Sequence, residues 1–256
     1  MLLDAKRAVV TGASSGIGKA TAQRLAREGA AVCVNYHTAR ERDAAQSVVD
    51  GIRRNGSRAI AVMADVGDEA AVQRMAEEVL AEFGGVDLLV NNAGINQEAA
   101  LFDMALDNWE AVLRTNLTGA FLCMREIGGI ILRGGGGVVV NISSVHEYIP
   151  WRKFSHYCAS KGGLKLLMES AASELAGRRI RIVNIAPGAI ETPMNQVLQD
   201  DPEARRAAER QIPIGRIGRA DEVAAVVAWV ASEEASYITG TTIVVDGGLS
   251  LHTEFA

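Results

Sequence analysis

The chain has 256 residues, of which 48% are hydrophobic and 22% are charged, with a formal net charge of −5. This length fits one α/β domain with a substantial core. The negative charge argues against a nucleic-acid surface, and no apolar run approaches the ~18 residues of a membrane span. A strand expected from residue 7 leaves no room for a signal peptide. Three cysteines without metal-ligand spacing suit a reducing compartment. We therefore expect a cytoplasmic protein without a metal site.

The N-terminal segment has the pattern strand, glycine turn, helix. An apolar run at 7–11 is typical of a buried parallel strand, and residues 19–28 are amphipathic at helical spacing. Glycines between them let the backbone approach phosphates, while the start of a helix offers free N–H groups. This context favours a dinucleotide cradle over a structural turn, although the glycine spacing differs from the usual G-x-G-x-x-G. The candidate binding residues are Gly12, Ser14, Ser15, Gly16, Ile17 and Gly18.

Strand-like and helical segments alternate along the rest of the chain. Apolar runs recur near 31–35, 59–63, 86–91, 137–142, 180–185 and 242–245, with helical stretches near 40–54, 68–83, 107–131, 155–176 and 220–232. This alternation predicts a Rossmann-type doubly wound parallel sheet in a three-layer α/β/α domain over residues 1–256. Ligands of such folds bind beyond the carboxyl ends of the strands. Five residues that follow strand-like runs should therefore meet there: Gly12, Asp65, Asn92, Ser144 and Pro187.

Two segments have more than one interpretation. Gly134-Gly-Gly-Gly137 precedes a strand and not a helix, which favours a helix-ending loop over a phosphate site. The segment near 188–213 is bracketed by prolines and rich in charged residues. It fits a lid over the substrate or an ordinary solvated helical insertion, and the sequence does not separate the two.

Tyr157 and Lys161 are the strongest candidates for chemistry. Residues four apart on a helix share a face, so the phenol and the ammonium should enter one site. The pKa of a free phenol is about 10, and a nearby cation favours phenolate and lowers it. This pairing predicts proton transfer to or from an oxygen. Cys158, which lies between them, is expected to be a buried thiol without a redox role.

Together these motifs resemble the classical short-chain dehydrogenase/reductase family over nearly the whole chain. The matching segments are Thr11–Gly18, Asp65-Val66, Asn91–Gly94, Asn116, Ser144, Tyr157 with Lys161, Pro187-Gly188 and Thr192. The resemblance implies a nicotinamide-dependent oxidoreductase with Ser144, Tyr157, Lys161 and Asn116 as catalytic residues. It also adds to the cofactor-binding set Tyr36, His37, Asp65, Val66, Asn92, Ala93, Gly94, Tyr157, Lys161, Pro187, Gly188, Ile190 and Thr192.

The resemblance also assigns roles. Tyr157 exchanges a proton with the substrate oxygen, and Lys161 holds the phenolate and hydrogen-bonds the nicotinamide ribose. Ser144 donates to the substrate oxygen as negative charge develops, while Asn116 belongs to a water relay between Lys161 and solvent. A homotetramer, formed through helices that contain 109–125 and 157–175, is implied as well.

The choice between the two nicotinamide cofactors depends on the end of the second strand. A carboxylate about 20 residues past the glycine turn normally binds the ribose 2′-hydroxyl of NAD, but no acid occurs here before Glu41. Without that repulsion, His37 and Arg40 can pair with a 2′-phosphate. We therefore expect that NADP is accepted, together with NAD.

Residues 143–151 suggest a substrate class. The stretch Ser-Ser-Val-His-Glu-Tyr-Ile-Pro-Trp is similar to the bacterial glucose 1-dehydrogenases of this family. By that resemblance a sugar pocket would contain Ser144, His146, Trp151, Tyr157 and Asn96, with Glu147 beside them. Asn96 lies where the glucose enzymes carry a glutamate, so another sugar, a polyol or another secondary alcohol also fits.

Two other functions remain open. A 3-oxoacyl-carrier-protein reductase would need a basic patch for its acidic carrier, for which Arg152 and Lys153 are the candidates near the cleft. A non-catalytic NADP-binding regulator on the same fold would tend to lose the tyrosine or the lysine. Both residues are present in this chain.

Overall fold

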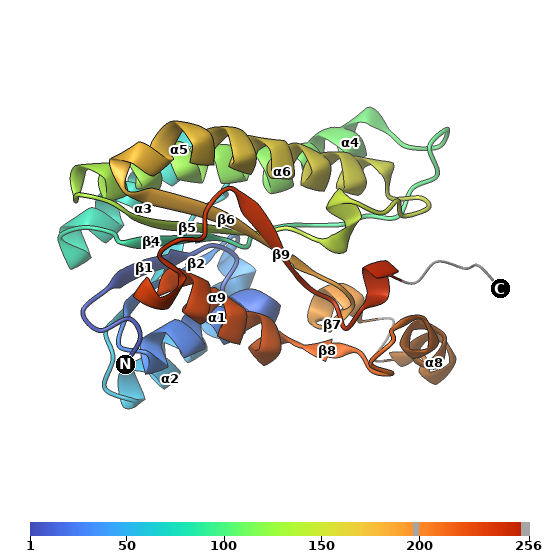
Figure 1. Cartoon of the computed structure of the whole chain (residues 1–256), viewed down its shortest axis with the longest axis horizontal. Coiled ribbons are helices and arrows are strands. Elements are labelled where there is room, and N and C mark those ends of the chain that lie inside the picture. Colours follow the sequence, from blue (N-terminus) through green and yellow to red (C-terminus); the bar gives the residue numbers. More distant parts are fainter. Residues whose placement is uncertain (197–199, 252–256) are drawn as a thin grey trace.

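The central element is a seven-stranded parallel sheet in the order β3-β2-β1-β4-β5-β6-β9 (Figure 1). The structure, a computed structural model, describes residues 1–196 and 200–251. The strands are β1 (Arg7–Val10), β2 (Ala31–Tyr36), β3 (Ala59–Met63), β4 (Leu88–Asn91), β5 (Gly137–Ile142), β6 (Ile180–Pro187) and β9 (Thr241–Val245). The chain winds outward from β1 in both directions, which confirms the predicted doubly wound fold.

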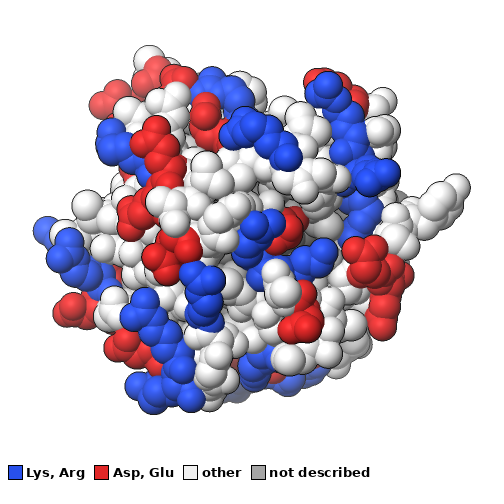
Figure 2. All heavy atoms as spheres, turned by 90° about the vertical axis from the view of Figure 1, so that its left-hand side faces the viewer, with Lys and Arg blue, Asp and Glu red and all other residues white. Residues whose placement is uncertain are grey.

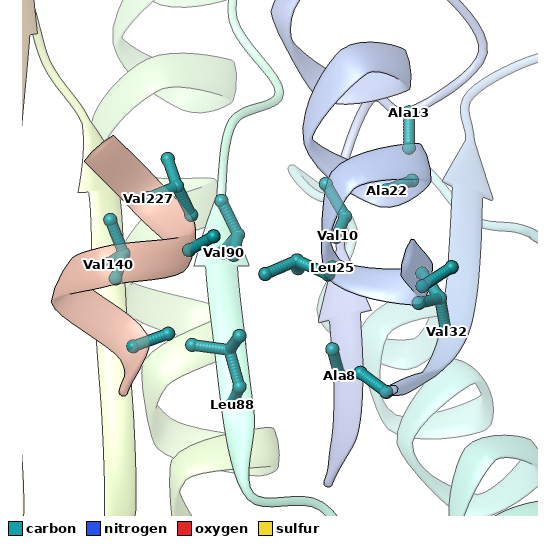
Figure 3. Packing of buried hydrophobic residues seen from close by; sticks show 14 of the residues in the cluster. Ala8, Val10, Ala13, Ala22, Leu25, Val32, Leu88, Val90, Val140 and Val227 are labelled. Atoms are coloured by element: carbon teal, nitrogen blue, oxygen red, sulfur yellow. The ribbon is translucent and has the colours of Figure 1, made fainter. Parts of the chain in front are cut away.

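Helices cover both faces of this sheet. One face carries α1 (Gly16–Arg27), α2 (Arg42–Arg54) and α9 (Ala220–Ala231), and the other carries α3 (Glu69–Phe83), α5 (Gly119–Arg133) and α6 (Ser155–Leu175). Because side chains alternate along a strand, β1 serves both cores. Val10 packs with Leu25 of α1 on one face (Figure 3), while Val9 joins the opposite core with Met75 of α3.

The predicted helix near 107–131 is interrupted. It consists of α4 (Leu106–Leu113), a π-helical turn at Arg114–Thr118 and α5. The wider turn contains Asn116, and such turns occur frequently at functional sites. The glycine run is a loop, as expected: α5 ends at Arg133 and β5 begins at Gly137.

The chain after β6 forms a small excursion from the sheet. It contains β7 (Ile190–Glu191), which pairs with β8 (Gly218–Arg219), and α8 (Pro202–Gln211). Short 3-10 turns occur at Ala39–Glu41, Val145–Glu147, Ala176–Arg178, Pro193–Asn195, Glu233–Ala235 and Leu249–Leu251. Within the described residues, no helix has the length and hydrophobicity to cross a bilayer. Lys and Arg side chains are interspersed with Asp and Glu over the face in Figure 2.

Candidate active site

A cavity of about 930 Å³ lies beyond the carboxyl ends of the strands and collects residues from distant parts of the sequence. Most of the sequence-predicted residues line it: Gly12, Ser14, Ser15, Gly16, Ile17, His37, Asp65, Val66, Asn92, Ala93, Gly94, Asn96, Ser144, His146, Trp151, Tyr157, Lys161, Pro187, Gly188, Ile190 and Thr192. Three predicted residues lie outside its lining, namely Gly18, Tyr36 and Asn116.

The glycine turn is shaped by close backbone contacts. Gly12 and Gly16 have φ values of +60° and +55°, a region that other residues rarely adopt. A Cβ on Gly18 would lie 2.4 Å from the carbonyl oxygen of Gly12, so Gly18 allows α1 to start directly against the turn. Asn92 Nδ2 fixes this geometry by donating to the carbonyls of Thr11 (2.8 Å) and Gly12 (3.0 Å). The start of α1 therefore faces the cavity, as a dinucleotide phosphate requires.

A carboxylate that the sequence did not point to occupies the far end of this turn. Glu41 Oε2 accepts hydrogen bonds from Ser14 Oγ (3.3 Å) and from the backbone N–H of His37 (3.1 Å). We expected no carboxylate here that would repel a 2′-phosphate, but the 3-10 turn at 39–41 folds Glu41 back to the end of β2. The pattern Thr38-x-x-Glu41, which is that of a capping box, is the signal that would have indicated this contact.

His37 and Arg40 both line this end of the cavity. His37 Nε2 lies 3.6 Å from Asp65 Oδ2, and Arg114 Nη1 lies at the same distance from that carboxylate. The two side chains expected to receive a 2′-phosphate thus share the region with two carboxylates, those of Glu41 and Asp65.

Tyr157 and Lys161 lie on one face of α6, as the spacing predicts. The Lys161 Nζ is 5.6 Å from the centre of the Tyr157 ring and donates to the carbonyl of Ile142 at 2.9 Å. Both side chains are buried. Burial raises the pKa of Tyr157 to about 12, a hydrogen bond with Ser144 acting in the opposite direction. Burial also lowers the pKa of Lys161 to about 8, against the attraction of Glu147.

The ionisation of Tyr157 therefore differs from the sequence-based expectation. We predicted a phenol pKa below its free value, but withdrawal from water outweighs the hydrogen bond with Ser144 and moves the pKa upward. The tyrosine is neutral near pH 7 in this structure, whereas Lys161 remains largely charged.

Asn116 does not line the cavity, and its side chain hydrogen-bonds to the backbone of Ile95 and to Ser160 of α6. Its Oδ1 accepts from the Ile95 N–H (2.8 Å), and its Nδ2 donates to the Ile95 carbonyl (2.9 Å) and to Ser160 Oγ (3.1 Å). Ser160 in turn donates to the carbonyl of Tyr157 at 2.7 Å. Asn116 thus joins the loop after β4 to the helix of Tyr157, and its part in a water relay stays a prediction.

Aromatic rings form one wall of the cavity. His146 stacks on Trp151 with ring centres 4.6 Å apart, and Trp151 stacks on Phe154 at 3.8 Å. The rings of Tyr157 and Trp151 meet edge to face, with centres 5.8 Å apart. Burial lowers the pKa of His146, and its Nδ1 is 3.2 Å from the Ile149 carbonyl. A neutral ring that donates from Nδ1 leaves Nε2 as an acceptor.

The sequence did not single out several residues at the substrate end. Met194, Gln211, Ile212 and Leu249 line the cavity from the excursion after β6 and from the C-terminal turn. Glu147, expected beside the substrate, is not among the lining residues and hydrogen-bonds toward the sheet.

Two further observations concern the exposure of the cysteines and the capacity to bind a metal ion. Cys158 is partly exposed and not buried as expected, whereas Cys33 and Cys123 are buried. Across residues 1–196 and 200–251, no group of three or more His, Cys, Asp or Glu residues is placed to hold a metal ion.

The chain is similar to known oxidoreductases over almost its whole length. Residues 12–250 match the family described as Enoyl-(Acyl carrier protein) reductase. This chain is 45% identical over 254 residues to 3beta-hydroxysteroid dehydrogenase 1 of Eggerthella lenta, and the alignment covers 99% of this chain and 97% of that protein. It is 41% identical over 252 residues to glucose 1-dehydrogenase 2 of Bacillus subtilis, with coverage of 98% and 96%. A gluconate 5-dehydrogenase structure from Burkholderia cenocepacia, in complex with NADP and tartrate, superposes with a TM-score of 0.92 at 33% identity, covering 98% and 97% of the two chains.

Proposed function

The chain belongs to the short-chain dehydrogenase/reductase family, and on this premise we propose that it transfers a hydride between a nicotinamide cofactor and a ring-borne secondary alcohol or its ketone. One observation carries the proposal. Ser144, Tyr157 and Lys161 meet in a cavity whose other end is the glycine turn at the start of α1. Side chains suited to proton transfer and a turn suited to a dinucleotide thus line one cavity, which supports the proposal.

The cofactor end fits NAD or NADP. The free N–H groups at the start of α1 suit the pyrophosphate, Gly12 and Gly16 leave room for it, and the region of Asp65 and Val66 suits the adenosine. The Burkholderia relative was solved with NADP, which supports use of the phosphorylated cofactor alongside NAD. A bound nicotinamide supplies the hydride acceptor in oxidation and the hydride donor in reduction.

Tyr157 and the residues around it transfer the proton that accompanies the hydride. In reduction, neutral Tyr157 donates its proton to the oxygen of the substrate while the Ser144 hydroxyl stabilises the developing negative charge. In oxidation, the phenolate of Tyr157 takes the proton of the alcohol, and the Lys161 ammonium stabilises that phenolate. Because burial raises the pKa of Tyr157 to about 12 and lowers that of Lys161 to about 8, the rate of oxidation should rise with pH as the phenolate fraction grows and decline where Lys161 loses its proton.

The substrate end favours a ring alcohol with an apolar body. Its lining includes apolar side chains from four segments: Ile95, Ile149, Trp151, Met194, Ile212 and Leu249. The two carboxylates among the lining residues described, Glu41 and Asp65, both lie at the cofactor end. Such a pocket suits a hydroxysteroid-like substrate, in agreement with the name of the Eggerthella relative.

Glucose or another sugar is a second candidate. It is supported by the Ser143–Trp151 stretch and by the Bacillus relative at 41% identity. The polar groups available to sugar hydroxyls are Asn96, His146 and Gln211. A reductase for acyl carriers is a further candidate, supported by the description of the matching family; against it, Lys153, one of the two cations near the cleft, is paired with Glu98 at 2.6 Å.

Initial rates of nicotinamide absorbance test the proposal, with NAD and NADP each measured against hydroxysteroids, simple cyclic alcohols, glucose and polyols. We expect turnover of the apolar ring alcohols. In Tyr157→Phe, we expect turnover to fall by roughly 10²–10⁴ while affinity for the cofactor is kept, and the exposed Tyr237→Phe serves as control. Cofactor binding without turnover of any alcohol or ketone would instead identify a regulator.

A further inference from the structure

A row of buried amides crosses three neighbouring strands of the sheet and ends at Glu147, in the turn after Ser144. Asn91, Asn141 and Asn184 stand in register on β4, β5 and β6. Asn91 Nδ2 donates to Asn141 Oδ1, and Asn141 Nδ2 donates to Asn184 Oδ1, both at 2.9 Å. Asn184 Nδ2 then donates to Glu147 Oε2 at 3.3 Å. All three amides therefore point their N–H groups toward one carboxylate, an arrangement in which each hydrogen bond strengthens the next.

The carboxylate of Glu147 also receives hydrogen bonds from two other elements. Thr242 Oγ1 of β9 donates to Oε1 at 2.6 Å, and the hydroxyl of Ser143 donates to Oε2. Ser143 immediately precedes the catalytic Ser144, whose Oγ accepts from the N–H of His146 at 3.2 Å. Glu147 thus hydrogen-bonds to Ser143 at the start of the turn that contains Ser144 and His146, and links this turn to β9 through Thr242.

Glu147 lies close to the cation of the site as well. Lys161 donates to the carbonyl of Ile142, the residue before Ser143, and Glu147 attracts its charge. The other charged or titratable groups near this carboxylate are Tyr148 and Lys165, and the latter is already paired with Glu169 on α6. Since Lys161 is buried, a neighbouring negative charge offsets part of the cost of keeping it ionised.

We propose that Glu147 is a positioning residue. It connects the turn after Ser144 to the row of Asn91, Asn141 and Asn184 by hydrogen bonds, and its negative charge helps to keep Lys161 protonated. This inference rests on the proposed function, in which that ammonium stabilises the phenolate of Tyr157. A neutral side chain of the same shape would satisfy much of the hydrogen bonding, so the charge of Glu147 is the part that a purely structural role does not require.

The test is Glu147→Gln, with Glu169→Gln as the matched control that removes a carboxylate from Lys165 instead. In protein with isotope-labelled lysine and no substrate, NMR titration follows Lys161, whose resonance is assigned by its loss in Lys161→Met. We expect the pKa of Lys161 to fall by at least about half a unit in Glu147→Gln and to stay unchanged in the control. An unchanged Lys161 titration, in a variant with native near-ultraviolet circular dichroism, would overturn the charge role.

Kinetics test the positioning role separately. In Glu147→Gln, the alkaline decline of kcat should begin at lower pH, and Glu147→Asp, which keeps the charge, should restore it. Thr242→Val releases one oxygen of the carboxylate and should lower kcat several-fold without moving the Lys161 titration. Equal kcat in Thr242→Val and the parent would contradict the positioning role, even where the glutamine variant does not fold. If the parent oxidises and reduces nothing, the proposed function fails, while the NMR titration still decides whether Glu147 supports Lys161.

Discussion

Among single residues, Glu41 should set the preference between the two cofactors. Its carboxylate accepts hydrogen bonds from Ser14 and from the His37 N–H at the end of β2, where it would repel a 2′-phosphate. Glu41→Gln keeps an oxygen for these hydrogen bonds and removes the repulsion. We expect the ratio of kcat/KM for NADP to that for NAD to rise roughly tenfold, which corresponds to ~1.4 kcal/mol.

The control for this change is Asp43→Asn, two residues further on, exposed and outside the cavity lining. It removes the same charge from the same surface without touching the glycine turn. A cofactor ratio that moves equally in both variants would assign the effect to general electrostatics and not to the contact of Glu41 with Ser14.

Residue-scale features were predictable from the sequence where they depend on local geometry. The shared face of Tyr157 and Lys161 follows from their spacing on one helix. The pKa of Tyr157 does not, because the burial that raises it depends on residues such as Trp151 that only the folded chain brings together. The hydrogen bonds of Glu41 were missed for a related reason, since a single 3-10 turn reverses the chain toward Ser14.

At the scale of elements, α8 should control access of the substrate. This helix buries no residue of its own and is joined to β7 by the ion pair of Arg205 with Glu191 at 2.6 Å, yet Ala208 and Gln211 line the cavity. Ala208→Trp places a large ring in that space. We expect KM for the alcohol to rise by about tenfold or more, with the dissociation constant of the cofactor unchanged.

Glu203→Trp puts the same ring on an exposed position of α8 that lies outside the cavity lining. It should leave KM near the parent value. A rise in both variants would mean that the added ring disturbs the helix itself, whereas a rise in neither would place the substrate away from α8.

Whole elements were predicted more reliably than interruptions within them. The strands β3 and β5 have the predicted bounds, 59–63 and 137–142, because buried parallel strands are nearly continuous apolar runs. The π-helical turn at Arg114–Thr118 leaves no such pattern. It is held by tertiary hydrogen bonds of Asn116 to Ile95 and Ser160, which no local periodicity reports.

For the molecule as a whole, the active site carries a cost in stability that depends on pH. Burial lowers the pKa of Lys161 from 10.5 to about 8. Below pH 8 the lysine is charged in both the folded and the unfolded chain, and burying that charge opposes folding by on the order of 3 kcal/mol. Between pH 8 and 10.5 the unfolded chain holds the proton and the folded chain has released it, so the free energy of unfolding rises with pH.

Lys161→Met removes this titration and provides the test. At pH 7 the variant is relieved of the buried charge, and its advantage over the parent should shrink steadily as pH approaches 10, before the tyrosines ionise. The lost hydrogen bond to the Ile142 carbonyl shifts the comparison by a constant amount, so the slope against pH is the decisive quantity. Urea unfolding of both proteins at matched concentration measures it, and parallel curves from pH 7 to 10 would contradict a depressed lysine. A slope of the expected sign would mean that this fold gives up stability at neutral pH to keep a cation beside Tyr157, as functional sites commonly do.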